Sequence, residues 1–116
     1  MIVTKIWLEL NSGEKNSIKE KMERIKAARW AKQPRDFPNA GSVFKRPNGH
    51  FVGPMIEELG LKGYRIGGAM VSEKHAGFIT NFDNARGSDI LSIIGHIKRM
   101  VNNTYGIKLE CEQRII

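Results

Sequence analysis

The segment Asn39–Pro47, NAGSVFKRP, gathers residue types that suit chemistry on an anionic ligand. Gly41 lets the backbone come close to a ligand, and Ser42 presents a hydroxyl group. Lys45 and Arg46 could neutralise a phosphate or a carboxylate. The same order also fits a plain turn in which Ser42 bonds its own backbone and the aromatic residue anchors the loop. From the residues alone, the turn is the favoured interpretation.

Two further polar residues are weak candidates when each is taken alone. His75, in SEKHAGF, could donate a hydrogen bond to a ligand oxygen, but a histidine at a strand entry is more often satisfied by the backbone. Glu112 lies on the polar side of the last segment, where a carboxylate is usually solvated and could pair with Arg114.

Common catalytic and metal-binding motifs are missing from the sequence. It contains no P-loop, dinucleotide-binding glycine motif, zinc-protease helix motif, C-x-x-C or nucleophile elbow. The three histidines share no metal-ligand spacing. Cys111 is the only cysteine, which excludes an internal disulfide and suits a reducing compartment. A metal site is not expected, and Cys111 is expected to be a small core residue.

Size and composition predict one globular domain. The chain has 116 residues, of which 41% are hydrophobic and 27% charged. No apolar run reaches the roughly 18 residues of a membrane span, and residues 1–10 lack the pattern of a secretory signal. We therefore expect a cytoplasmic protein. The net charge of +7 favours an anionic partner, but scattered cations do not choose between nucleic acid, phosphorylated small molecules and acidic proteins.

The N-terminal half alternates between predicted elements and a long irregular segment. Residues 2–10 alternate in the manner of a half-buried strand. Ser17 and Glu20 have capping-box spacing, which predicts a helix from there to about Trp30. Three prolines between residues 32 and 47 predict a loop, and a loop of that length in a small domain is often functional. A short helix follows between Pro54 and Gly60.

The C-terminal half predicts the rest of a small sheet. Residues 63–72 and 75–82 are expected to be two strands or irregular extended segments. Ser88 is expected to cap a long helix that ends near Gly106 and buries a stripe formed by Leu91, Ile94, Ile97 and Val101. Residues 107–116 alternate as a strand with one polar face. The whole is predicted to be α+β, a small, mainly antiparallel sheet with helices packed on one side.

Four segments together resemble one family: KQP, PNAGSVFKRP, GLKGYRIGGAMVSEKHAGFITN and YGIKLECEQRI. In order and spacing they are similar to the C-terminal, substrate-binding domain of UDP-N-acetylenolpyruvylglucosamine reductase, the MurB flavoenzyme family of peptidoglycan synthesis. The resemblance covers nearly the whole chain. It implies a single domain over residues 1–116 that is cut from a longer enzyme and lacks the FAD-binding N-terminal region.

The resemblance also implies an activity, UDP-N-acetylmuramate dehydrogenase. In that family NADPH reduces FAD, and the flavin delivers a hydride to the enolpyruvyl double bond of UDP-N-acetylglucosamine enolpyruvate. FAD and NADPH are thus implied for the full-length enzyme and none for this chain alone. The family's catalytic arginine comes from the flavin-binding region and has no counterpart here, so the chain alone is expected to be inactive.

Residue by residue, the resemblance assigns the family's proton donor to Ser42 and its second acid to Glu112. A carboxyl group in that second role is expected to be kept neutral by burial and an anionic neighbour. Glu110 belongs to the same motif and is expected to support it. Lys32 and His75 match positions that contact the substrate.

Two cations follow in the same motif, and at the second, Arg46, the sequence departs from the family. Lys45 is expected to bind the substrate. Arg46 stands where the family often has a substrate-binding asparagine, so an ion pair with phosphate or carboxylate is expected there instead. An alternative of a different class also fits the +7 charge, a non-catalytic basic module that binds RNA or another polyanion. The missing basic stripe makes this alternative the weaker one, and nucleic acid is not the expected partner.

Overall fold

The computed structural model describes residues 1–116, and their contacts divide into two units. The first unit is Met1–Ala31 and the second is Lys32–Ile116. All sixteen buried hydrophobic residues lie in the second unit, between Val43 and Leu109. The assignment of residues 1–116 to one domain stays a prediction, and the hydrophobic core is confined to the second unit. None of the helices is long and apolar enough to cross a membrane.

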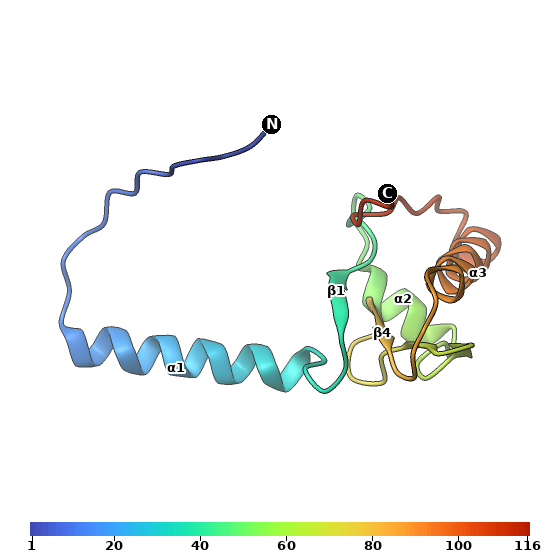
Figure 1. Cartoon of the computed structure of the whole chain (residues 1–116), viewed down its shortest axis with the longest axis horizontal. Coiled ribbons are helices and arrows are strands. Elements are labelled where there is room, and N and C mark those ends of the chain that lie inside the picture. The colour runs from blue at the N-terminus through green and yellow to red at the C-terminus, as the bar shows by residue number, and fades with distance from the viewer. The chain divides into compact units, whose positions relative to one another are not determined.

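The first unit consists of an irregular segment and a single helix, α1 (Lys15–Lys32), whose last residue is the first of the second unit (Figure 1). The strand predicted over residues 2–10 is wrong, because a strand needs a neighbour for its backbone groups and this segment has none. The predicted capping role of Ser17 is also wrong. The Glu14 carboxylate accepts the backbone N–H groups of Asn16 (2.9 Å) and Ser17 (2.6 Å), and these bonds lower the pKa of Glu14.

The second unit is built on a four-stranded antiparallel sheet with the order β1-β4-β3-β2. Its strands are β1 (Asn39–Ser42), β2 (Arg65–Ile66), β3 (Ala69–Val71) and β4 (Phe78–Asn81). β1 falls in the segment predicted to be a loop, and the strand predicted over residues 63–72 is a β2–β3 hairpin that turns at Gly67. The mainly antiparallel sheet itself is confirmed.

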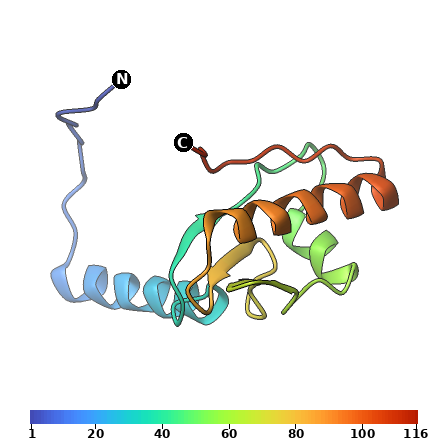
Figure 2. The same ribbon diagram turned by 45° about the vertical axis from the view of Figure 1, so that its right-hand side comes forward.

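Two helices belong to this unit, α2 (Val52–Glu58) and α3 (Gly87–Tyr105), and α3 packs along one face of the sheet (Figure 2). The face of α3 formed by Ile93, Ile94, Ile97 and Val101 joins sheet residues such as Val71 and Ile79 in one core. The prediction that Leu91 is buried is wrong, since it is 46% exposed and Ile93 is buried instead. The α2–α3 packing confirms helices on one side.

The N-terminus of α3 is tied to the β2–β3 hairpin through Asp89. Its carboxylate accepts the backbone N–H of Arg86 at 2.9 Å and that of Gly68 at 3.3 Å. Ser88, which was predicted to be the cap, lies inside the first turn, because the helix begins at Gly87. The predicted end at Gly106 is confirmed, where a left-handed backbone (φ 69°) closes the helix.

The C-terminal segment returns beside the residues that follow β1, without forming the predicted strand over 107–116. A single antiparallel bridge joins Phe44 to Cys111. The Lys45 N–H donates to the Glu110 carbonyl at 2.9 Å, and the Glu112 N–H donates to the Val43 carbonyl at 2.8 Å. Cys111 is half-buried and packs against the core. The segment is therefore held along residues 43–45 (Figure 1).

A tight turn at Gly68 gives the first prediction, on stability. A Cβ there would overlap the Asp83 carbonyl oxygen and lie 2.6 Å from the Ala85 nitrogen, so the backbone would have to move. We expect Gly68→Ala to lower the free energy of unfolding by about 1–3 kcal/mol, the usual cost of overpacking. Urea denaturation measures this. Gly87→Ala is the matched control, because a Cβ there meets nothing within 4 Å. Equal denaturation midpoints for the two variants would contradict the prediction.

Candidate functional site

Ser42 lies where three backbone segments meet. The neighbouring residue, Val43, donates its N–H to the Gly77 carbonyl at 3.0 Å and accepts the Glu112 N–H at 2.8 Å. The Gln113 side-chain amide donates to the Gly41 carbonyl at 3.2 Å. The end of β1 is therefore held on one side by the entry to β4 and on the other by the C-terminal segment. The structure places Ser42 and Glu112 on neighbouring segments.

The backbone just before Ser42 is bulged and open. The pairing of β1 with β4 shifts register between Asn39 and Ser42, and Gly41 takes a left-handed conformation with φ 82°. The Asn39 side-chain oxygen accepts the Gly41 N–H at 3.0 Å, which fixes the bulge. A Cβ at Gly41 would meet nothing within 4 Å, so the space beside this residue is open. Ser42 itself is exposed at the same edge.

The His75 ring is fixed against the same edge. The backbone N–H of Gly77 donates to His75 Nδ1 at 3.0 Å, and the ring meets Phe78 edge to face with centroids 4.9 Å apart. A Cβ added at Gly77 would lie 3.0 Å from His75 Cε1 and 3.9 Å from Ser42 Oγ. The imidazole and the hydroxyl thus both border Gly77. Because Nδ1 accepts a hydrogen bond, the neutral ring carries its proton on Nε2, which can donate to a ligand.

Glu112 reaches this region from the C-terminal segment, but it is exposed. This chain alone does not bury the Glu112 side chain, and the burial expected to keep its carboxyl group neutral stays a prediction for the full-length enzyme. The backbone position of Glu112 is nevertheless fixed by its bond to Val43. The pKa of Lys45 is raised mainly by its hydrogen bond to Glu110 and by the charge of Glu110, and the negative charge of Glu112 makes a smaller contribution.

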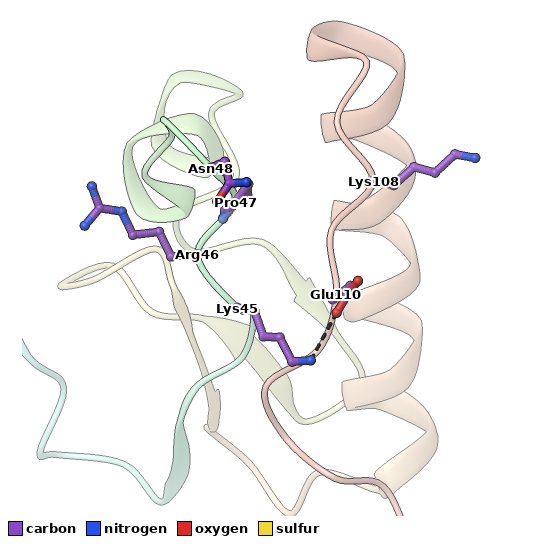
Figure 3. A pocket seen from close by; sticks show the side chains of 6 residues that line it. All are labelled: Lys45, Arg46, Pro47, Asn48, Lys108 and Glu110. Atoms are coloured by element: carbon purple, nitrogen blue, oxygen red, sulfur yellow. Dashed lines mark hydrogen bonds and ion pairs between the residues drawn. The ribbon is translucent and has the colours of Figure 1, made fainter.

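Lys45 and Arg46 border an open hollow of about 240 Å³ that also includes Pro47, Asn48, Lys108 and Glu110 (Figure 3). Lys45 Nζ lies 3.0 Å from Glu110 Oε2, and the hydrogen bond and charge of Glu110 raise the pKa of Lys45. The Arg46 side chain points away from this pair, and its guanidinium lies 3.8 Å from the centre of the Phe51 ring. The two cations therefore face different surroundings.

Lys32 is not brought into the cluster by any hydrogen bond or ion pair. It is the exposed last residue of α1, just before Gln33 and Pro34. The residue before a proline is disfavoured in helical conformation, which explains why α1 ends there. Of the six predicted site residues, the structure groups Ser42, His75 and Glu112 around the end of β1. Lys45 and Arg46 come three and four residues after Ser42 in the sequence.

Comparison with known proteins identifies the family. The family model for "UDP-N-acetylenolpyruvoylglucosamine reductase, C-terminal domain" matches residues 33–116. The chain belongs to this family. A reductase of this name from Caldanaerobacter subterraneus is 49% identical over 115 residues, which are 99% of this chain and 38% of the relative. The corresponding protein of Latilactobacillus sakei is 50% identical, with the same two shares.

A solved structure shows the same fold. The crystal structure of UDP-N-acetylenolpyruvylglucosamine reductase from Thermus caldophilus matches with a TM-score of 0.75 at 34% identity. The match covers 91% of this chain and 37% of that structure. The predicted family and its α+β fold are confirmed. This chain spans somewhat more than a third of the length of the relatives that it matches.

Three residues that border the candidate site were not predicted from the sequence: Gly53, Gly77 and Gln113. A Cβ at Gly53 would lie 3.3 Å from His75 Cε1, so Gly53 and Gly77 together leave room for the ring. Gly77 stands directly before a strand, where a glycine indicates close approach of another group, and this signal could have found it. Gln113 bonds across 72 residues of sequence, and no local pattern predicts such a contact.

The packing of His75 gives the second prediction. Gly77→Ala should displace the imidazole, because a Cβ would lie 3.0–3.1 Å from Cε1 and Nδ1. We expect the Nδ1 bond to be lost and the ring to sample both neutral tautomers. Imidazole ¹⁵N shifts of His75 measure this directly. Gly95→Ala serves as the control, because its Cβ would meet only the end of the Arg99 side chain, at 3.5 Å. An unchanged His75 tautomer in Gly77→Ala would contradict the prediction.

Proposed function

We propose that the second unit, Lys32–Ile116, forms the substrate-binding and proton-donating domain of UDP-N-acetylmuramate dehydrogenase. The observation that supports this most is the meeting of Ser42, His75 and Glu112 around one exposed strand end, in a domain of this family. The family match favours this function over the binding of RNA. The substrate is then UDP-N-acetylglucosamine enolpyruvate, and the product belongs to peptidoglycan synthesis.

The open backbone beside Ser42 fits the approach of a flat ring. The bulge at Gly41 carries no side chain, and the space around it is free. FAD, reduced by NADPH, supplies a hydride to one carbon of the enolpyruvyl double bond when it is bound in the full-length reductase. The other carbon then bears the electron pair of the broken π-bond. Ser42 donates its hydroxyl proton to that carbon, which completes the reduction and leaves Ser42 to be reprotonated from solvent.

Serine is a weak acid, and two conditions make this transfer possible. The acceptor must be strongly basic, as an enolate is, and water must be excluded so that the transfer is not lost to solvent. Ser42 is exposed in this chain. The water-excluding surface is therefore assigned to the flavin-binding region and to the bound substrate.

Glu112 and His75 are proposed to act on the substrate's carboxylate and nearby oxygens. Glu112 stabilises or protonates the carboxylate as charge develops on it, and the flavin-binding region supplies the burial that this role needs. His75 offers its Nε2–H, because Nδ1 is already occupied by the Gly77 N–H. The ring is held by packing on two sides, so this donor is positioned before substrate arrives.

The cations are proposed to bind the diphosphate and carboxylate groups. The side chains of these residues are exposed and can therefore bind an anionic group of a ligand from solution. The residues are Lys32, Lys45 and Arg46. Lys45 is partly neutralised by Glu110, so a ligand phosphate must compete with that carboxylate. The Arg46 guanidinium instead lies over the uncharged Phe51 ring, so its full positive charge is available to a ligand. An ion pair from Arg46 would replace the hydrogen bond of the family's usual asparagine.

The test joins this chain to the part of the Caldanaerobacter reductase that precedes the region matching this chain. We expect the chimera to bind FAD and to reduce the UDP-linked enolpyruvyl sugar with NADPH. The chain alone is expected neither to bind FAD stoichiometrically nor to oxidise NADPH, and the enzyme is expected to be cytoplasmic. A flavin-loaded chimera whose flavin is reduced by NADPH, but which does not convert the sugar, would refute the proposed function.

A further inference from the structure

Phe51 is a large apolar side chain that the core of the second unit does not use. It is 59% exposed, and it belongs neither to the buried cluster nor to the side chains packed against it. It directly precedes α2, and its side chain makes no capping bond to that helix. The ring therefore contributes little to the packing of the unit. Its role depends on what lies against it.

The Arg46 side chain lies over this ring. The guanidinium carbon is 3.8 Å from the ring centroid, well within the roughly 6 Å over which an aromatic face attracts a cation. A tight turn between the two residues brings them together. The His50 N–H donates to the Pro47 carbonyl at 3.2 Å, and Gly49 takes a left-handed conformation with φ 73°. The contact is made at the surface, because Arg46 is also exposed.

The contact holds a long side chain without occupying its hydrogen-bond donors. A free arginine loses rotamer freedom when it binds an anion, and this loss weakens binding. A ring that already holds the guanidinium lowers that cost before a ligand arrives. The Phe51 ring offers no carboxylate or carbonyl oxygen, so the N–H donors of Arg46 remain available. Lys45 differs, because the Glu110 carboxylate accepts its hydrogen bond at 3.0 Å.

The backbone of Arg46 is fixed relative to Ser42. Between them, the Val43 carbonyl accepts a bond from the C-terminal segment, and the Lys45 N–H donates one to it. Four residues of extended chain span about 13 Å, at roughly 3.3 Å per residue. A ligand whose reacting group lies at Ser42 can therefore place a second group near Arg46 only if it is extended. The guanidinium points away from Lys45 and Glu110 (Figure 3), so it can meet an anion of its own.

We propose that Phe51 is a positioning residue, whose ring holds the Arg46 guanidinium ready for an anionic group of the substrate. This group is the diphosphate or the carboxylate, and both offer the paired oxygens that a guanidinium binds with two N–H donors. Phe51 itself touches no reacting atom. The proposal rests on the proposed function for the identity of the substrate, whereas the Arg46–Phe51 contact belongs to this chain alone.

Phe51→Leu in the chimera described above tests the proposal. Leucine keeps an apolar side chain at this exposed position but has no aromatic face. We expect the Kd and KM of the enolpyruvyl sugar to rise about two- to fivefold, the effect of one exposed cation–π contact. The kcat should not change, because Arg46 holds its anion equally before and during the reaction. Phe51→Tyr keeps the ring and should retain the original constants. Unchanged binding by Phe51→Leu would overturn the proposal.

A second substitution separates positioning from a structural effect of Phe51. Arg46→Asn removes the guanidinium and leaves the ring nothing to hold. In that background, Phe51→Leu should change neither Kd nor KM further, because the two residues act as one unit. If Phe51→Leu weakened binding equally with and without Arg46, the proposal would be overturned.

Phe82→Leu is the matched control. Phe82 is also exposed, and the guanidinium of Arg65 lies 4.0 Å from the centroid of its ring. It follows the last residue of β4, whereas Ser42 pairs with the first residue of that strand. The control thus removes the same kind of contact at the other end of β4 and should leave substrate binding unchanged. Equal weakening by Phe51→Leu and Phe82→Leu would overturn the proposal.

UDP-N-acetylglucosamine, which has the diphosphate but no enolpyruvyl carboxylate, identifies the anion. If Phe51→Leu weakens its binding as much as that of the enolpyruvyl sugar, Arg46 binds the diphosphate. If only the enolpyruvyl sugar is affected, Arg46 binds the carboxylate, and either result supports the proposal. The proposed function fails separately. A chimera that binds the sugar with this dependence on Phe51, but does not convert it after flavin reduction, would refute the proposed function alone.

Discussion

Ser42→Ala in the chimeric reductase is expected to leave the reduction of flavin by NADPH nearly unchanged. It should slow the oxidation of the reduced flavin by the enolpyruvyl sugar about 100-fold or more, because a positioned proton donor contributes about 10²–10⁴ in rate. Single-turnover kinetics separate these two half-reactions. The Ser42 side chain is exposed beside Gly77, so its loss leaves no cavity in the core.

Two further variants test whether the effect is specific to the acidic proton of the Ser42 side chain. Ser88→Ala, on the exposed first turn of α3, should leave both half-reactions unchanged. Ser42→Cys should recover part of the rate, since a thiol is a stronger acid than a hydroxyl. Normal turnover of Ser42→Ala would show that the proton comes from another group.

Glu112→Gln is expected to have the next largest effect. It keeps the shape of the side chain and the backbone bond to Val43, but it removes the acid. We expect kcat to fall about 100-fold or more with little change in KM, because the lost interaction forms only as charge develops on the substrate. Steady-state kinetics of the chimera check this. A purely structural role would instead alter flavin content and thermal stability.

Glu110→Gln is the matched control, two residues away on the same segment. Glu110 pairs with Lys45 at 3.0 Å, and its hydrogen bond and charge are the main causes of the raised pKa of Lys45. The substitution should lower that pKa towards its ordinary value and leave kcat within about tenfold, since an exposed pair contributes little. The raised pKa means that the pair's contribution is present below the ordinary lysine pKa and is lost as pH rises through the folded value. If Glu110→Gln and Glu112→Gln behaved alike, Glu112 would not be the specific acid.

The helices of the second unit could be predicted from the sequence because their signals are local. Ile94, Ile97 and Val101 repeat at helical spacing, and Gly106 ends the helix with a conformation that glycine adopts readily. The exact start was missed because the Asp89 carboxylate, rather than Ser88, accepts the backbone N–H of the N-cap residue Arg86. That choice depends on a tertiary contact, since the Asp89 carboxylate also bonds Gly68.

The strands were predicted less well because each needs a distant partner. Residues 2–10 and 107–116 both alternate, yet neither forms a strand in this chain. β1 has no clear pattern in the sequence and forms because Asn39 and Ser42 pair with residues about 40 positions later. Alternation reports which face can be buried, whereas strand formation depends on whether a neighbouring backbone is present.

The candidate site followed from the resemblance more than from residue chemistry. Taken alone, Ser42 fitted a plain turn and Glu112 a solvated carboxylate. Their proximity depends on backbone bonds from Val43 to Gly77 and Glu112, which no local pattern encodes. The burial predicted for Glu112 is not found in this chain, where its side chain is exposed, and the chain spans 38% of the length of a relative that it matches.

The most direct test of a substrate half-site in this chain is an amide NMR titration with the UDP-linked enolpyruvyl sugar. An unrelated RNA oligonucleotide is the control. The proposed function predicts shifts confined to residues near Lys32, Ser42, His75 and Glu112 with the sugar, and none at these residues with RNA. Broad, salt-sensitive shifts with RNA and none with the sugar would contradict it and favour a polyanion-binding module.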